Sequence, residues 1–230
     1  MNLTTFCEQA CDIEKSTYLH YSVIMKNHSL ELKPRFEIVY RGKMFEVVTW
    51  EGKPGVTFEA AVRAPGVRLM IETEKSGMKA LLMTKEIRRE ADGYDFRLPG
   101  GKVFDSLDEL DQHSESGADI LPIAEAAAKK EGKQEAGISG GEYTFVGVSK
   151  AGASVEWDLY YFNVRQAEIG DQELEEQERG DIETVVLSAQ EIFEKLSQRE
   201  IKEGRSADML WSWLQQGGFI KFENWNPSSI

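Results

Sequence analysis

Between residues 34 and 88, short runs of apolar and β-branched residues are separated by turn-forming residues. The runs PRFEIVY and MFEVVTW flank Arg41-Gly42-Lys43 and predict a β-hairpin. Further strands are predicted for TFEAAVR, which follows the turn EGKPG, and for GVRLMIET and KALLMTKEI, which flank the turn KSG. We therefore expect the folded part of the chain to begin with antiparallel β-structure.

The second half of the chain mixes strand and helix patterns. A helix is predicted over ILPIAEAAAKKEGKQEA, with Asp119 as its cap, Pro122 in its first turn and Gly137 at its end. YTFVGVS, WDLYYFNV and TVVLS predict strands, whereas AQEIFEKLSQREI and SADMLWSWLQQ predict two more helices. This order predicts an α+β or α/β protein that has a mixed β-sheet with helices on its faces. We take the fold class to be α+β, an α/β/α sandwich.

Changes in pattern suggest the limits of the parts. Residues 1–30 show no clear period and are interpreted as an N-terminal appendage, residues 31–64 as a β-sheet extension, residues 65–216 as the main domain and residues 217–230 as a tail. The polar residues 105–118, DSLDELDQHSESGA, are predicted to be a surface insertion with a short helix. ADGYD, residues 91–95, and the acidic stretch 166–183 are predicted to be loops.

The charge balance narrows the choice of partners. Asp and Glu number 40 against 27 Lys and Arg, a formal net charge of −13, so we expect neither nucleic acid nor an anionic membrane as a partner. A phosphorylated small molecule remains compatible if a divalent cation lies between it and the carboxylates. Cys7 and Cys11 are interpreted as free thiols, with a redox pair or half of a metal site as the alternatives. The N-terminus has no signal-peptide pattern, so cytoplasm is the expected location.

Two carboxylates on the predicted helix are the first candidates for chemistry. Glu131 and Glu135 are four residues apart and therefore share a helix face. Their repulsion would become chelation if a hard cation such as Mg²⁺, which prefers carboxylate oxygens, lay between them. Ahead of the helix, the turn Gly100-Gly101 permits a close approach of backbone and ligand. Taken alone, these Glu residues also fit an ordinary solvated helix face.

The combination of glycine turn, helix and paired Glu resembles the Nudix box. That family pattern runs from a glycine to a Glu and then to Arg-Glu-hydrophobic-x-Glu-Glu-x-Gly-hydrophobic. The matching positions here are Gly101, Glu131, Glu135, Gly137 and Ile138. The sequence on both sides of the box resembles the ADP-ribose and nucleotide-sugar pyrophosphatases of the family. The similar segments are FEAAVRAPGVRLMI, FRLPGG and ERGDIETVVLSAQEIFEKL, so the resemblance spans residues 35–215.

The box also departs from the pattern. Lys130 stands in place of the usual Arg, Gly132 in place of a hydrophobic residue and Gln134 in place of a Glu. The upstream Glu of the pattern falls on Pro122, and the loop after Gly101 is longer than usual. Nearby acids that are candidates to replace that Glu are Asp105, Asp108 and Glu109.

The resemblance implies a set of site residues. Glu131 and Glu135, with the Gly101 carbonyl and Glu156, would hold Mg²⁺ or Mn²⁺, and Gln134 would position a metal-bound water. Candidates for diphosphate contacts are Arg88, Arg89 and Arg97. Candidates for the general base are Glu173, Glu175, Glu176 and Glu178. Trp157 and Tyr160 are candidates to stack on a nucleobase, although strand aromatics more often belong to the core.

The function expected from this resemblance is metal-dependent hydrolysis of a nucleoside diphosphate linked to another moiety, such as ADP-ribose or a nucleotide sugar. The alternative is a catalytically weak or inactive Nudix-fold module that binds a nucleotide-like ligand or a protein. An isomerase or mRNA-decapping activity on the same fold has weaker support. A homodimer is expected through the N-terminal sheet, which would otherwise leave an exposed edge.

Overall fold

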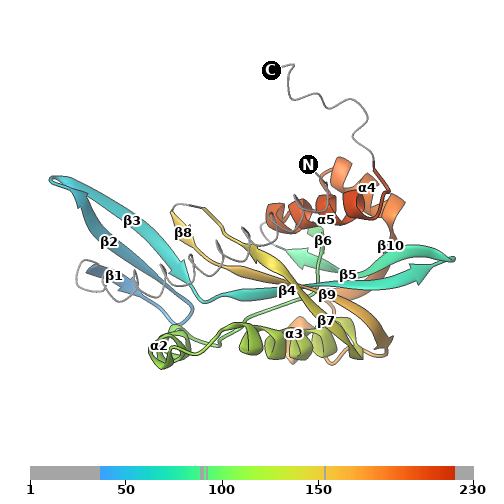
Figure 1. Cartoon of the computed structure of the whole chain (residues 1–230), viewed down its shortest axis with the longest axis horizontal. Coiled ribbons are helices and arrows are strands. Elements are labelled where there is room, and N and C mark those ends of the chain that lie inside the picture. Colours follow the sequence, from blue (N-terminus) through green and yellow to red (C-terminus); the bar gives the residue numbers. More distant parts are fainter. Residues whose placement is uncertain (1–36, 89–90, 92, 153, 221–230) are drawn as a thin grey trace, which may run out of the picture.

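The computed structural model describes residues 37–220, except 89–90, 92 and 153 (Figure 1). The predicted appendage of residues 1–30, with Cys7 and Cys11, lies outside the described residues, as do Arg89 and most of the predicted tail.

The smaller of the two sheets carries the predicted hairpin. Its strands are β1 (Glu37–Arg41), β2 (Phe45–Lys53), β3 (Val56–Arg63) and β8 (Val155–Glu156). Their order is β1-β2-β3-β8, with antiparallel pairing up to β3 and parallel pairing between β3 and β8. The hairpin around Arg41-Gly42-Lys43 is confirmed, whereas β8 was not predicted as a separate strand.

The larger sheet forms the centre of the molecule. Its strands are β4 (Gly66–Lys75), β5 (Met78–Arg88), β6 (Gly93–Arg97), β7 (Ile138–Ser149), β9 (Leu159–Ile169) and β10 (Ile182–Ser188). The order is β10-β5-β4-β9-β7, with β6 paired to β5. The sheet is mixed, because β4 runs parallel to β9 while the other pairs are antiparallel.

The turn between β4 and β5 has the tight conformation that its sequence predicts. Lys75 pairs with Met78, and the two residues between them, Ser76 and Gly77, have φ angles of 56° and 73°. Two successive positive φ angles match the right-handed twist of the strands in a tight hairpin. The predicted KSG turn is thus confirmed.

Helices cover both faces of the larger sheet, which confirms the predicted α+β sandwich (Figure 1). The helices of the described chain are α2 (Leu107–Ser116), α3 (Leu121–Ala136), α4 (Ala189–Ser197) and α5 (Gly204–Gln216), with the short 3-10 helix η2 (Glu176–Glu178). Helix α3 lies on one face of the sheet, and α4 and α5 lie on the other.

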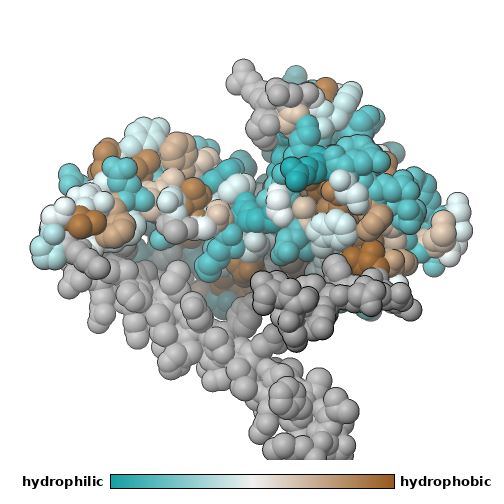
Figure 2. Space-filling model, turned by 90° about the horizontal axis from the view of Figure 1, so that it is seen from above, coloured by the Kyte–Doolittle hydropathy of each residue, from teal (hydrophilic) through white to brown (hydrophobic). Residues whose placement is uncertain are grey.

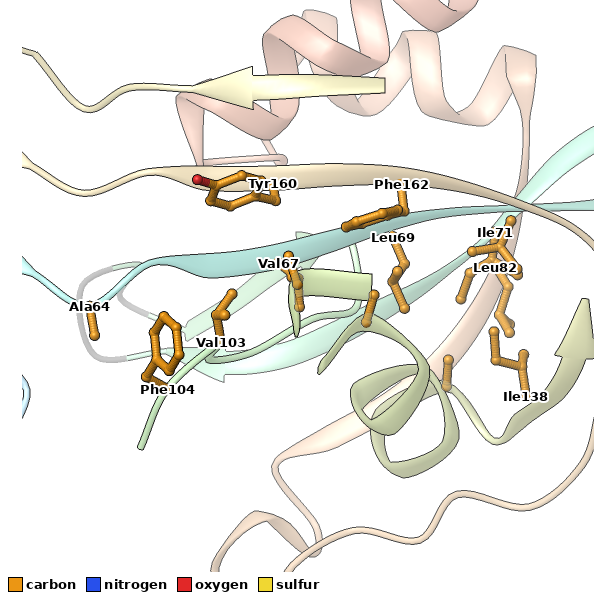
Figure 3. Close-up of a cluster of buried hydrophobic side chains, with 14 of the residues drawn as sticks. Ala64, Val67, Leu69, Ile71, Leu82, Val103, Phe104, Ile138, Tyr160 and Phe162 are labelled. Carbon is orange, nitrogen blue, oxygen red and sulfur yellow. The ribbon is translucent and has the colours of Figure 1, made fainter. Parts of the chain in front are cut away.

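The sheet therefore separates two hydrophobic cores. On the α3 side, Ala124 and Ala128 pack with Leu69, Ile71 and other buried side chains. Figure 3 shows Leu69 and Ile71 in this core. The core on the other side contains Ile192 of α4 and Leu210 of α5. Small residues on α3 bring this helix close to β4, to which the glycine loop that precedes the box is hydrogen-bonded.

Several boundaries differ from the predictions. The predicted loop 91–95 is partly strand, because β6 starts at Gly93 and pairs with β5. Residues 166–169 continue β9 because they pair with the start of β7. Helix α4 ends at Ser197 instead of residue 201, and Ile120 rather than Asp119 is the N-cap of α3. Asp119 nevertheless accepts a hydrogen bond from the Leu121 N–H, while Pro122 and Gly137 occupy their predicted positions.

The predicted insertion contains helix α2, which is anchored rather than detached. Leu107 is buried with Phe104 in the core on the α3 side. Arg41 of β1 donates hydrogen bonds to Asp108 (2.9 Å) and Asp111 (2.8 Å). Helix α2 therefore connects the smaller sheet to the domain that carries the box.

Candidate functional site

The loop that precedes the box is fixed by backbone hydrogen bonds to β4. The N–H groups of Leu69 and Val67 donate to the carbonyl oxygens of Pro99 and Gly101, each at 2.9 Å. Gly100 has a φ of 154°, and a Cβ built there would lie 2.1 Å from the Val67 carbonyl oxygen. Only glycine fits so close to the backbone of β4, so the Gly100-Gly101 turn gives the loop a fixed position beside α3.

Glu135 is a buried carboxylate at the C-terminal end of α3. The residue is 5% exposed, and its Oε2 accepts a hydrogen bond of 2.7 Å from the Gly100 N–H. Burial raises the pKa of Glu135 to about 8, because the charged form loses its hydration, while the Gly100 N–H acts in the opposite direction. The negative charges of Glu86 and Glu131 raise it further.

Glu131 lies one helical turn earlier and faces the same loop. A Cβ on Gly101 would lie 2.2 Å from Glu131 Oε1, so the absence of a side chain at residue 101 makes room for this carboxylate. The backbone N–H of Lys102 is hydrogen-bonded to Glu131. The pKa of Glu131 is raised, chiefly by burial and also by the charge of Glu178. The structure thus places Glu131 and Glu135 on one helix face, as their spacing predicted, and places Gly101 beside Glu131.

The chemistry of these donors fits a hard divalent cation. The two carboxylates repel each other where water is largely excluded, and a cation would relieve both the repulsion and the burial cost. The Gly101 carbonyl, the third predicted oxygen ligand, accepts the Val67 N–H of β4. Within the described residues, no three His, Cys, Asp or Glu side chains are grouped closely enough to hold a metal ion by themselves. Carbonyl, water or substrate oxygens would therefore complete the coordination.

Glu86 is a buried acid whose charge acts on Glu135, and it was not predicted as a site residue. It lies on β5, is 2% exposed, and accepts hydrogen bonds from Thr84 Oγ1 (2.6 Å) and Arg88 Nε (2.7 Å). Its charge contributes to the raised pKa of Glu135. Thr84 and Glu86 are polar residues two apart in a strand, a spacing that places both on one face, which was the available signal.

Arg68 is a second residue of this charge cluster that was not predicted as a site residue. It is buried on β4 and donates from Nη1 to the Val67 carbonyl (3.0 Å), while its Nε has no hydrogen-bond partner. Burial lowers the pKa of Arg68, and Arg97 lowers it further, whereas Glu203 and Glu135 act in the opposite direction. An arginine within the apolar run GVRLMI was the signal, because buried strands rarely contain a charge without a partner.

The predicted diphosphate-binding arginines have different environments. Arg88 is paired with buried Glu86, so it belongs to the same cluster of charges as Glu135. Arg97 is buried and lies 3.6 Å from Asp95. Arg88 is thus linked to Glu135 through Glu86, whose charge acts on Glu135. Arg97 is linked to Glu135 through Arg68, because the charges of Arg97 and Glu135 both act on Arg68.

The four candidate bases occupy the segment around η2. Glu173 is exposed and pairs with Lys133 (3.0 Å), and Glu175 and Glu176 are also exposed. Glu178 is partly buried and acts electrostatically on Glu131. The loop is attached to α3, because the Glu173 N–H donates to the Gln134 carbonyl (3.0 Å). Glu178 is therefore the candidate base whose charge is found to act on Glu131 of the box.

Two other predicted site residues lie differently. Glu156 is exposed on β8 in the smaller sheet, and no ion pair or hydrogen bond in the described part of the chain joins it to Glu131 or Glu135. Gln134 is partly buried on α3. Tyr160 belongs to the hydrophobic core, which favours the core interpretation, whereas Trp157 is only partly buried and contacts two arginines.

The departures from the box have structural explanations. A Cβ on Gly132 would lie 3.1 Å from side-chain atoms of both Leu69 and Ile138, so these residues fill the space that a side chain at position 132 would need. Lys130 is exposed, and Pro122 is exposed in the first turn of α3. Of the acids considered as replacements, Asp108 is paired with Arg41, Asp105 lies 3.6 Å from Lys102, and Glu109 accepts the Asp105 N–H.

A separate cavity of about 240 Å³ lies on the face of the sheet that α5 covers. Its one lining carboxylate, Glu72, is paired with two cations, because it accepts from Arg165 (3.1 Å) and lies 3.2 Å from Lys79. Met70 and Trp213, which also line it, belong to the core on that side. This cavity is therefore separated by the sheet from the box carboxylates.

Comparison with known proteins supports the fold. No family model matches the sequence, and no curated protein matches it. Among solved structures, the chain is similar to the crystal structure of an ADP compounds hydrolase, with a TM-score of 0.57 and 18% sequence identity over 80% of this chain and 94% of that one. At this identity the likeness shows the fold, which is the Nudix fold that the sequence predicted.

No helix in the described part of the chain combines the length and the apolar character needed to cross a membrane.

Proposed function

We propose that the protein is a metal-dependent hydrolase, a Nudix-type pyrophosphatase that cleaves the diphosphate of a nucleoside diphosphate linked to another moiety, such as ADP-ribose or a nucleotide sugar. The observation that carries the proposal is the pair Glu131 and Glu135, which lie one turn apart on α3 and face the N–H groups of a glycine loop. The fold shared with an ADP compounds hydrolase supports it.

Glu131 and Glu135, with the Gly101 carbonyl, would hold Mg²⁺ or Mn²⁺. When bound, the cation would neutralise negative charge on the diphosphate and lower the pKa of a water molecule. Burial of both carboxylates supports this role, because their raised pKa values reflect a cost that a cation would offset.

The remaining residues would orient the substrate and move a proton. Water attacks one phosphorus, the bond from that phosphorus to the bridging oxygen breaks, and two monophosphates form. Arg88 and Arg97 would face the negative charge of the phosphates. Glu178 is the proposed acceptor of the proton that the water loses, because it is the loop carboxylate related to Glu131. Gln134 would orient the water.

A product-resolved hydrolysis assay tests this function. Purified protein is incubated with Mg²⁺ or Mn²⁺ and ADP-ribose, nucleotide sugars, dinucleotides or nucleoside triphosphates, beside the variant Glu135→Gln. We expect turnover of one class of diphosphate by the natural protein and its loss in the variant. Absence of turnover with every substrate, in protein shown to be folded, would reject the proposal.

A non-catalytic module that binds a nucleotide-like ligand or a protein is the second candidate. The observation in its favour is Gln134, which leaves the C-terminal half of α3 with Glu131 and Glu135 where the family pattern has three acids. Metal binding discriminates between the two functions. An enzyme should bind Mn²⁺ through Glu131 and Glu135, as measured by calorimetry, whereas a binding module need not.

We also propose that the protein forms a homodimer through the smaller sheet. Strand β1 is an edge of this sheet, and Ile38, Val39 and Tyr40 are each more than half exposed. Hydrophobic residues are visible on this end of the molecule in Figure 2. An open apolar edge favours pairing with another strand. Light scattering should give twice the 26.0 kDa of one chain, and a monomer mass would contradict the proposal.

A further inference from the structure

Trp157 carries two positively charged neighbours. The guanidinium carbons of Arg63, at the end of β3, and of Arg205, in the first turn of α5, each lie 4.2 Å from the centroid of its ring. Stacking on an indole occupies the flat face of a guanidinium and leaves the N–H groups at its edge available. The ring therefore holds two arginines from distant parts of the sequence in a fixed arrangement.

The two guanidiniums differ in their partners. Arg205 donates from Nε to Glu203 (3.2 Å) and from Nη1 to the Trp157 carbonyl (2.8 Å). Arg63 makes no ion pair or hydrogen bond with any side chain in the described part of the chain, and Glu156, next to Trp157, does not pair with it. Within the described residues, the five N–H donors of Arg63 are thus available, in a protein whose net charge is −13.

Arg63 lacks a counterion among the described residues, whereas Arg205 is paired with Glu203. The pKa of Arg63 is lowered, first by partial burial and then by the positive charge of Arg205. Holding like charges close together costs free energy, which an anion bound by their N–H groups would offset. The arginines therefore have the character of a site prepared for a negatively charged group.

The position of Trp157 relates these arginines to the glycine loop. A Cβ built on Gly66 would lie 2.8 Å from the Gly101 carbonyl oxygen and 3.8 Å from Trp157 Nε1. The indole thus lies beside the backbone that faces Glu131. Gly101 therefore lies between Glu131 on one side and the indole, which packs against the core on the α5 side, on the other.

We propose that Arg63 and Arg205, stacked on Trp157, form an anion subsite that takes a phosphoryl group of the ligand. The inference rests on the proposed function, because it takes this ligand to be the same diphosphate compound. The subsite lies on the side of Gly101 occupied by Trp157, and it uses residues that are separate from Arg88 and Arg97. Its planar donors suit the oxygens of a phosphoryl group, to which arginine binds with two parallel hydrogen bonds.

Calorimetric titration with inorganic pyrophosphate, in metal-free buffer of low ionic strength, tests the subsite without any turnover. We expect the natural protein to bind pyrophosphate and Arg63→Gln to bind it about tenfold more weakly, the loss of one charge-assisted contact. Arg63→Lys should fall between them, because lysine keeps the charge but lacks the planar fork. The matched control is Arg199→Gln, which removes the same charge from an exposed loop.

Circular dichroism of each variant verifies folding. Arg205→Gln should also weaken pyrophosphate binding. If Arg205→Gln does not fold, Arg63→Gln decides the test, because Arg63 is exposed. The proposal would be overturned if the natural protein does not bind pyrophosphate, or if Arg63→Gln and Arg199→Gln bind it equally. If hydrolysis fails but pyrophosphate binding depends on Arg63, the subsite stands and the hydrolase is rejected. If the protein hydrolyses a substrate but Arg63→Gln binds pyrophosphate as well as the natural protein does, only the subsite is rejected.

Discussion

Replacing Glu135 by Gln should stabilise the metal-free protein at alkaline pH, although it should abolish hydrolysis. The Glu135 carboxyl is 5% exposed, and its pKa is raised from 4.5 to about 8. Between these two values the folded chain keeps a proton that the unfolded chain has released. Raising the pH therefore destabilises the fold throughout this range, and the full cost is present above about pH 8. Gln carries no charge and retains an oxygen to accept the Gly100 N–H.

The magnitude follows from the two pKa values of Glu135. The difference between 4.5 and about 8 corresponds to roughly 5 kcal/mol of unfolding free energy at high pH. Relaxation of the surroundings and sharing of the repulsion with Glu86 and Glu131 reduce what one substitution recovers, so we expect about 2–5 kcal/mol. This is a large share of the stability of an ordinary domain.

Urea unfolding in the presence of a chelator measures this effect. At about pH 5 the natural protein and Glu135→Gln should differ by less than about 1 kcal/mol, and at about pH 9 the variant should be more stable by the amount above. The control Glu142→Gln makes the same chemical change at an exposed position. Added Mn²⁺ should stabilise the natural protein more than the variant. Parallel pH dependence of the natural protein and Glu135→Gln would refute the account of Glu135.

Three further substitutions probe the geometry of the box. Gly101→Ala places a Cβ 2.2 Å from Glu131 Oε1; because this carboxylate can rotate away, hydrolysis should fall at least about tenfold while the unfolding free energy changes by less than about 1 kcal/mol. Gly100→Ala meets the backbone of β4 instead and should cost about 1–3 kcal/mol or more, measured by urea unfolding. Gly132→Leu should lower the melting temperature by roughly 2–12 °C, since overpacking against Leu69 and Ile138 costs about 1–3 kcal/mol. An unchanged melting temperature for Gly132→Leu would contradict the close packing of α3 on β4.

Features set by neighbouring residues could be predicted from the sequence. The turn at Ser76-Gly77 and the helix end at Gly137 depend on backbone conformations that glycine favours. The proximity of Glu131 and Glu135 follows from helix periodicity alone. These local rules gave the sandwich, its order of elements and the central pair of the candidate site.

Features that depend on tertiary pairing were missed. Glu86 joins the box carboxylates because β5 lies beside β4, to which the glycine loop is hydrogen-bonded, and neither pairing is specified by residues near Glu86. Arg63 and Arg205 meet on Trp157 although they come from β3 and α5, which are distant in sequence. The burial of Arg68 was indicated only by its position within an apolar run.

The most direct test of the central claim is hydrolysis of ADP-ribose in ¹⁸O-labelled water with Mg²⁺ or Mn²⁺, followed by mass spectrometry of the products. If the box carboxylates support attack of water on phosphorus, one of the two monophosphate products should carry a single ¹⁸O, and Glu135→Gln should form neither product above background. Label in a sugar hydroxyl instead of a phosphate, or equal turnover by the natural protein and Glu135→Gln, would contradict the account.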